Sequence, residues 1–192
     1  MGANTGQYAD LVRSLGYRGT IVSFEPQSEA SGVLQKRAMR TPDWDVRPVA
    51  LGPTSGTATL RISRNSVSSS LLPIGDEHVR AAPKSSVISH EDVKVSTLDD
   101  ELTGVPGRAV WLKLDVQGTE LPILLGGTET LARTVAVQSE MSLRGLYEGQ
   151  TDYLELCAHL REQGLVLCHI LPGFTDSGSG ALLQVDGLFL RL

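Results

Sequence analysis

Three carboxylates stand where buried strands are expected to end. "GTIVSFEP" places Glu25 at the end of an apolar run, "AVWLKLD" ends in Asp115, and "TVAVQSEM" ends near Glu140. In an open α/β sheet, ligands bind beyond the carboxyl ends of central strands. Asp115 is therefore a candidate to accept the proton of a reacting hydroxyl, and its alternative role is to cap the helix that follows near Gly118. Glu140 can serve as a second base, clamp a substrate, or hold a hard cation with Asp115, although no histidine joins them at ligand spacing.

A glycine-bracketed turn, "MGANTG", opens the chain and leads into a helical pattern. Its form is G-x-x-x-G, whereas the dinucleotide fingerprint is G-x-G-x-x-G and uses its middle glycine to approach a pyrophosphate. Asn4 stands between Gly2 and Gly6, so the turn favours a ligand without phosphates at this point and disfavours a nicotinamide-dependent oxidoreductase. Glu25 follows at ribose-binding spacing, where a carboxylate can accept hydrogen bonds from both hydroxyls. The alternative for Glu25 is an ordinary solvated acid at a strand end.

Helical and strand patterns alternate along most of the chain, which predicts an α/β fold with a largely parallel sheet. Apolar residues recur at helical spacing after the opening turn, and Gly16 stands where this helix should end. The last two strands are joined by "PGFTDSGSG" and should pair antiparallel. The apolar stripes of the expected helices consist of Tyr8, Leu11, Val12 and Leu15; Ala30, Val33, Leu34 and Ala38; and Tyr153, Leu156, Cys157 and Leu160. A further helix is expected to begin near Gly118 and Thr119 and to continue through "TELPILLGGTETL".

The alternation stops between about residues 54 and 93. "GTATLRIS" reads as an exposed strand, and the rest is rich in Ser and Pro without a period. We interpret this segment as an insertion or lid within one domain spanning 1–192. His78 and His90 lie in it and are candidate proton carriers, whereas His159 and His169 fall in a predicted helix and strand.

The composition of the chain limits the classes of ligand and the cellular compartment that we expect for it. The formal net charge is −5, and the 17 Lys and Arg are scattered, which argues against a nucleic-acid ligand. Cys157 and Cys168 fit small buried hydrophobes better than a disulfide, which favours a reducing compartment such as the cytoplasm. No apolar segment approaches the roughly 20 residues that a membrane span needs. The oligomeric state cannot be predicted from these features.

The glycine turn, the ribose-binding acid and an antiparallel last strand together indicate S-adenosylmethionine as the ligand. The segments "GANTGQYADLVRSLGYRGTIVSFEP", "NSVSSSLL", "VSTLDDEL", "WLKLDVQGTELPILLGG", "EMSLRGLYEGQTDYLEL" and "VDGLFLRL", in this order, resemble the FkbM family of S-adenosylmethionine-dependent methyltransferases. The resemblance implies the class I methyltransferase fold, a Rossmann-like sheet of seven strands with an antiparallel last strand. It also implies methyl transfer to a hydroxyl oxygen of a small molecule, such as a glycoside, a glycolipid or a polyketide-type metabolite.

The resemblance also assigns roles to individual residues. Gly2, Asn4 and Gly6 would hold the methionine end of the cofactor, and Glu25 the ribose. Ala50 and Leu51 would contact the adenine edge, although "ALG" is equally how a buried strand meets a turn. Asp115 would face the sulfonium, with Glu140 as its catalytic partner, and no metal is assigned. The residues expected to contact the acceptor are Ser68, Ser69, Ser70 and Tyr147.

Two other functions are compatible with the sequence, and the start of the chain predicts a further strand. The chain could be a non-catalytic or degenerate nucleoside-binding domain, or, with less support, the nicotinamide-dependent oxidoreductase considered above. The strand that normally feeds such a glycine turn does not precede Gly2. We therefore expect about five or six apolar, β-branched-rich residues upstream of Met1 to complete the sheet.

Overall fold

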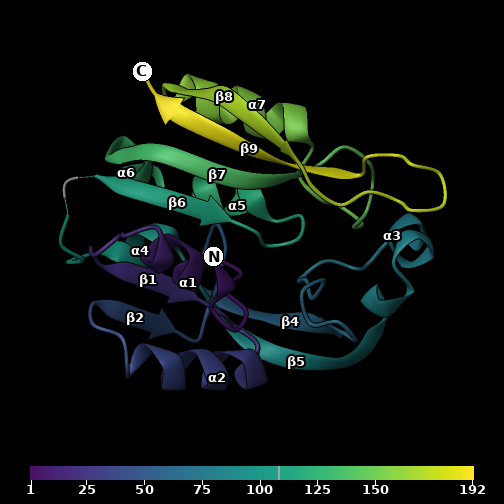
Figure 1. The fold of residues 1–192 in the computed structure, drawn as a ribbon, viewed down its shortest axis with the longest axis horizontal. Helices are drawn as coiled ribbons and strands as arrows, with labels where there is room; N and C mark the ends of the chain where they lie inside the picture. The colour runs from purple at the N-terminus through teal and green to yellow at the C-terminus, as the bar shows by residue number, and fades with distance from the viewer. Residues whose placement is uncertain (108) are drawn as a thin grey trace.

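The computed structural model describes residues 1–107 and 109–192 and has a mixed α/β fold (Figure 1). Its strands form three sheets in the described residues, with orders β1-β2, β3-β5-β4 and β6-β7-β9-β8. The strands are β1 (Ile21–Phe24), β2 (Trp44–Arg47), β3 (Ala50–Leu51), β4 (Gly56–Ser63), β5 (Val87–Ser96), β6 (Val110–Leu114), β7 (Thr134–Ser142), β8 (Leu165–Pro172) and β9 (Gln184–Arg191). The α-helices are α1 (Gln7–Ser14), α2 (Ser28–Ala38), α3 (Asp76–Ala81), α4 (Leu98–Leu102), α5 (Glu120–Leu125), α6 (Thr128–Ala132) and α7 (Tyr153–Glu162), and a short 3₁₀ helix covers Pro83–Ser85.

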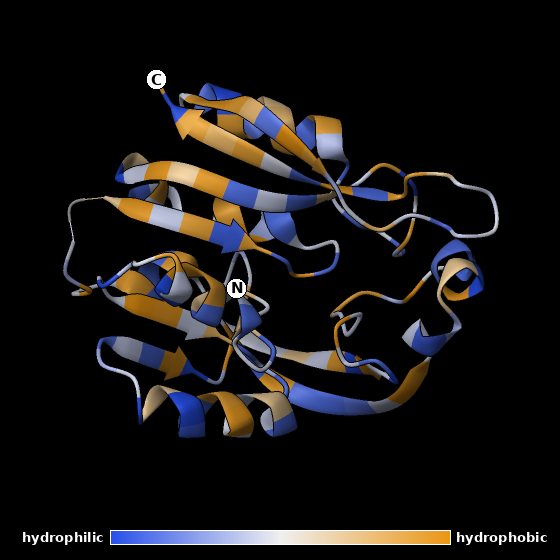
Figure 2. Ribbon diagram, viewed as in Figure 1, coloured by the Kyte–Doolittle hydropathy of each residue, from blue (hydrophilic) through white to orange (hydrophobic). Residues whose placement is uncertain are grey.

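The four-stranded sheet contains the main core. β6 and β7 run parallel, whereas β9 runs antiparallel to both β7 and β8, so the antiparallel final pair expected from the sequence is confirmed. Side chains from this sheet and from α4, α5, α6 and α7 form one buried apolar cluster that includes Leu114, Val137 and Phe189. Hydrophobic residues cover most of β1 and β6 (Figure 2). These two strands lie on opposite sides of a slot.

The slot between β1 and β6 is the point where the expected single sheet is divided. Residues 1–3 cross its carboxyl end: the amino group of Met1 donates to the Lys113 carbonyl at 2.8 Å, and the amide of Ala3 donates to the Phe24 carbonyl at 3.1 Å. β1 pairs with β2 on its other side, and β6 pairs with β7. The sheet edges that face the slot therefore belong to two different sheets.

Helix α1 directs its apolar residues toward the slot. Ala9 is the residue of α1 that is buried, whereas Leu11 is 51% exposed and Leu15, just after the helix, is 77% exposed. Tyr8, Leu11, Val12 and Leu15 all line the cavity that includes the slot. The predicted stripe exists, but it does not pack into a closed core. Gly16 ends the helix as expected, at φ +96°.

The region from 54 to 93 is more regular than its sequence indicates. β4 and β5 form a long antiparallel pair, so its last seven residues belong to a strand. β5 is mostly exposed and polar, with the sequence "VISHEDVKVS", which explains why its periodicity is weak. The helix expected from Gly118 is interrupted at Gly126 and Gly127. A Cβ on Gly126 would lie 2.3 Å from the Gly52 carbonyl oxygen, and one on Gly127 would lie 2.6 Å from the Leu98 side chain.

No helix in residues 1–107 and 109–192 has the length and apolar character needed to cross a membrane.

Candidate active site

A cavity of about 1440 Å³ opens between β1 and β6 and continues past their carboxyl ends. Its apolar part is the slot, lined by β1, β6 and the stripe of α1. Its polar part lies where the strands end and contains Asn4, Glu25, Asp115 and Gln117. Small-molecule sites usually have volumes of about 300–1,000 Å³. The cavity therefore has room for a ligand at its polar end in addition to the slot.

The glycine turn forms one wall of the polar part. Gly2, Asn4 and Gly6 have φ values of +66°, +46° and +97°, so Asn4 adopts the left-handed backbone for which glycine is usually required. A Cβ on Gly2 would lie 1.7 Å from the Asp115 carbonyl oxygen, whereas one on Gly6 would meet the Leu34 and Trp44 side chains at 2.8 Å. Gly2 is thus required by the loop after β6, and Gly6 by the packing of α1 against α2 and β2.

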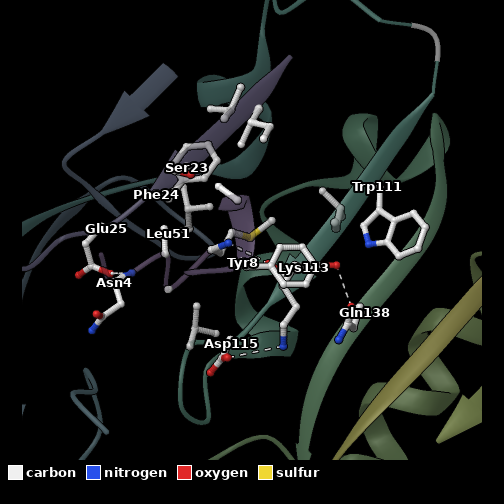
Figure 3. Close-up of a pocket in the computed structure, with 18 of the residues that line it drawn as sticks. Asn4, Tyr8, Ser23, Phe24, Glu25, Leu51, Trp111, Lys113, Asp115 and Gln138 are labelled. Atoms are coloured by element: carbon white, nitrogen blue, oxygen red, sulfur yellow. Dashed lines mark hydrogen bonds and ion pairs between the residues drawn. The ribbon is translucent and has the colours of Figure 1, made fainter. Parts of the chain in front are cut away.

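Glu25 lies at the end of β1, and its carboxylate is held by backbone amides (Figure 3). One oxygen accepts the amide of Asn4 at 2.7 Å, and the other accepts the amide of Gln27 at 3.0 Å. Burial raises the pKa of Glu25 even though both hydrogen bonds favour the charged form. Each oxygen keeps a second lone pair for a ligand hydroxyl. The placement fits the predicted role with the ribose.

Asp115 follows β6, and its side chain lies beside that of Lys113 from the same strand, with both residues lining the cavity (Figure 3). The Lys113 ammonium lies 2.8 Å from Asp186 and 3.5 Å from Asp115. Burial acts to lower the pKa of Lys113, but the carboxylates of Asp115 and Asp186 raise it overall. Lys113 therefore remains charged and makes its closer contact with Asp186, while the Asp115 side chain is 40% exposed. An exposed carboxylate of this kind can accept a proton from a bound hydroxyl.

Gln117 was missed by the sequence analysis, although it lies between the two carboxylates that were selected. Its side-chain nitrogen donates to Asp115 at 2.9 Å and to Glu140 at 2.7 Å. Its side-chain oxygen accepts the Tyr147 hydroxyl at 2.5 Å. The only available signal was its place two residues after a strand-end acid, and a glutamine there does not indicate chemistry by itself.

Glu140 does not line the cavity and lies behind Gln117. One of its oxygens also accepts the side-chain nitrogen of Gln184 at 2.8 Å. Burial, reinforced by the charges of Asp115 and Glu120, raises the pKa of Glu140 to about 8. Burial likewise raises the pKa of Glu120 to about 7. Glu140 therefore carries a proton over much of the neutral pH range and contacts Asp115 through an amide rather than directly.

The four residues predicted to contact the acceptor, three serines and a tyrosine, lie partly on the cavity wall and partly behind it. Ser69 and Ser70 line the cavity, whereas Ser68 and Tyr147 are buried behind it. The Tyr147 hydroxyl, which donates to Gln117, also lies 3.2 Å from the Ser68 carbonyl, and its ring meets His78 edge-on at a centroid distance of 5.1 Å. Burial lowers the pKa of His78 and raises that of Tyr147. Contact of these serines and Tyr147 with an acceptor remains a prediction.

Backbone strain is concentrated at the polar end. The non-glycine residues with positive φ in the described chain are Asn4, Asp43, Ser66 and Gln117, and all except Asp43 line the cavity. The Asn4 side chain donates to the Ser66 hydroxyl at 3.3 Å, which joins the glycine turn to the serine segment. Such conformations are costly and cluster at functional sites. Their position supports this end of the cavity as the site.

Ala50 and Leu51 also line the cavity, so all the residues predicted to bind the cofactor adjoin one space. The chemistry of this set fits S-adenosylmethionine, because the Glu25 carboxylate can accept hydrogen bonds from ribose hydroxyls. In the part of the chain that the structure describes, no group of three or more His, Cys, Asp and Glu residues is arranged to hold a metal ion.

Comparison with known families and structures identifies relatives of this arrangement. The sequence profile described as "Methyltransferase FkbM domain" matches residues 1–167. The crystal structure of methyltransferase FkbM from Methylobacillus flagellatus KT superposes with a TM-score of 0.59 at 14% identity, covering 97% of this chain and 41% of that one. This chain thus corresponds to less than half the length of that relative. A putative RNA methyltransferase, PH1948 from Pyrococcus horikoshii, gives a TM-score of 0.48 at 15% identity and covers 100% and 73% of the two chains. No curated protein matches the sequence significantly.

Proposed function

The chain belongs to the FkbM methyltransferase family, and we propose that it transfers the methyl group of S-adenosylmethionine to a hydroxyl of a small molecule. The acceptor class we propose is a sugar-containing or other secondary metabolite, of glycoside, glycolipid or polyketide type. The observation that carries the proposal is the placement of Glu25 and Asp115 on one cavity, at the carboxyl ends of β1 and β6. Class I topology, with β9 as the antiparallel last strand, is part of the proposal. We also propose a cytoplasmic location, since both cysteines are free thiols.

When bound, S-adenosylmethionine would supply the methyl group, and breaking its S–CH3 bond would release S-adenosylhomocysteine. Glu25 would hold the ribose hydroxyls, the turn from Gly2 to Gly6 the methionine end, and Ala50 and Leu51 the adenine edge. The Asp115 carboxylate would accept the proton of the acceptor hydroxyl within hydrogen-bond distance. Ser69 and Ser70, which line the same cavity, would contact the acceptor.

Cofactor binding is tested first, by titration calorimetry with S-adenosylmethionine and with NADH. The protein should bind the first and not the second. Glu25→Ala should weaken binding by about 1–3 kcal/mol, because a charged hydrogen-bond partner is lost. Glu29→Ala, on the exposed side of α2, is the matched control and should leave the affinity unchanged. Preferential binding of NADH would overturn the assignment of the cofactor.

Catalysis is tested separately, by transfer of a labelled methyl group to a panel of neutral glycosides and polyketide-type alcohols. Asp115→Asn should bind S-adenosylmethionine as tightly as the wild type and slow single-turnover transfer by about 10²-fold. Equal rates would remove Asp115 from the chemical step. Cofactor binding without transfer to any alcohol would favour the non-catalytic, nucleoside-binding alternative.

A further inference from the structure

The side chain of Gln117 is fixed at every polar atom. Its nitrogen has two hydrogens, one directed to Asp115 and the other to Glu140, at 2.9 and 2.7 Å. Its oxygen accepts the Tyr147 hydroxyl at 2.5 Å. The Asp115 carboxylate can only accept hydrogen bonds, so the end of the amide that faces it must be the nitrogen. The amide oxygen is then the end that faces the Tyr147 hydroxyl.

The backbone of Gln117 is fixed as well. The residue is 7% exposed and has φ +58°, and its carbonyl accepts the Ser70 hydroxyl at 2.8 Å. A glutamine at this φ is held by its surroundings rather than by its own preference. Few degrees of freedom remain for the side chain, so its amide is a rigid support for whatever it contacts.

Asp115 has two competing partners, and their distances differ. Gln117 holds one of its oxygens at 2.9 Å, whereas the Lys113 ammonium is 3.5 Å from the other. An unrestrained carboxylate beside a partly buried ammonium would move into direct charge-assisted contact, at about 2.8 Å. Such a contact would occupy the second oxygen and make it a poorer proton acceptor. The amide of Gln117 therefore opposes a closer ion pair.

On the basis of the proposed function, we propose that Gln117 is a positioning residue for methyl transfer. It anchors Asp115 to the half-buried Glu140 through one amide nitrogen and keeps the other Asp115 oxygen away from Lys113. Gln117 itself takes no proton and contacts no reacting atom in this role. Gln117 acts by fixing the position of the Asp115 carboxylate. A small displacement of a catalytic group can slow a reaction strongly.

The test compares Gln117→Met with Gln184→Met. Both substitutions keep the length of the side chain and remove its N–H donors. The first loses the contacts with both carboxylates and the acceptor of the Tyr147 hydroxyl. The second loses donors to Glu140 and Ser142 but leaves Asp115 untouched. Crystal structures of the two variants should show the Lys113–Asp115 distance shortened from 3.5 Å to about 2.8 Å in Gln117→Met alone.

Kinetics provide the second measurement. With an acceptor identified from the panel, Gln117→Met should slow single-turnover methyl transfer about tenfold or more, with calorimetric affinity for S-adenosylmethionine unchanged. Gln184→Met should stay close to the wild-type rate. Equal losses in both variants, or an unmoved Asp115 in the Gln117→Met crystal structure, would overturn the positioning role. The crystal structures need no turnover, so they test Gln117 even if the protein transfers no methyl group.

Discussion

Replacing Gly6 with alanine separates two explanations for the opening turn. If Gly6 is needed because the cofactor approaches its backbone, the substitution should affect ligand binding and leave folding unchanged. The structure gives a different reason. A Cβ at this position would meet the Leu34 and Trp44 side chains at 2.8 Å, and these two residues form a buried cluster with Ala9. The added methyl group is therefore directed into the core.

The size of the effect follows from two contributions. At φ +97°, the left-handed backbone costs an alanine about 1–2 kcal/mol. Overpacking of a well-filled core costs about 1–3 kcal/mol in addition. For a chain of this length, each kcal/mol corresponds to about 2–4 °C in melting temperature. The two contributions add to about 2–5 kcal/mol, so Gly6→Ala should melt about 4–20 °C below the wild type.

Gly16→Ala is the matched control, because Gly16 has φ +96° and no atom within 4 Å of the Cβ position. Gly16→Ala has the backbone cost alone, about 1–2 kcal/mol, and should lose only about 2–8 °C. Circular dichroism melts of the three proteins, with urea titrations at 25 °C, measure the difference. Equal destabilisation by the two substitutions would refute the packing argument, and unchanged stability of Gly6→Ala combined with lost S-adenosylmethionine binding would support the ligand explanation.

Three further predictions follow from the same structure. Folding raises the pKa of Glu120 to about 7 and that of Glu140 to about 8. The folded protein therefore binds more protons than the unfolded chain between about pH 5 and 8. Its free energy of unfolding should fall as the pH rises through that window. Glu140→Gln should flatten this slope in urea titrations and the exposed control Glu162→Gln should not; a slope unaffected by either would contradict the raised pKa. Hydrogen exchange over residues 66–86 should slow when S-adenosylmethionine and an acceptor are added, whereas fully protected amides in the free protein would rule out a mobile lid. A designed N-terminal extension of about five apolar, β-branched residues should enter the slot between β1 and β6 and raise the melting temperature, and a Gly-Ser extension of equal length should not; equal melting of both would show that the slot does not accept a strand.

Local patterns predicted most helices and strands, because periodicity reports which face of an element is apolar. They did not show what that face contacts. The stripe through Leu11 was predicted correctly, yet it faces the slot rather than a closed core. β5 was missed because a mostly exposed polar strand has little hydrophobic alternation.

The candidate site was predictable to the extent that it follows from strand ends. Glu25 and Asp115 directly follow β1 and β6, two strands of different sheets that face the same slot, and both residues line one cavity. The position of Glu140 behind Gln117 was not predictable, because it depends on side-chain direction and on an amide contributed by another loop. The same holds for Tyr147, which contacts Gln117 from a segment 30 residues away in the chain.

The glycine turn connects the two halves of the site. Asn4 donates its amide to Glu25 on the β1 side, while the backbone of Gly2 lies against the Asp115 carbonyl on the β6 side. The turn therefore sets the separation of the two carboxylates that the proposed reaction uses. A side chain at Gly2 could be accommodated only by moving the turn away from the loop after β6, since the atom it would meet belongs to the backbone. Gly2 and Gly6 are thus required for different reasons, the first for the geometry of the site and the second for the stability of the fold.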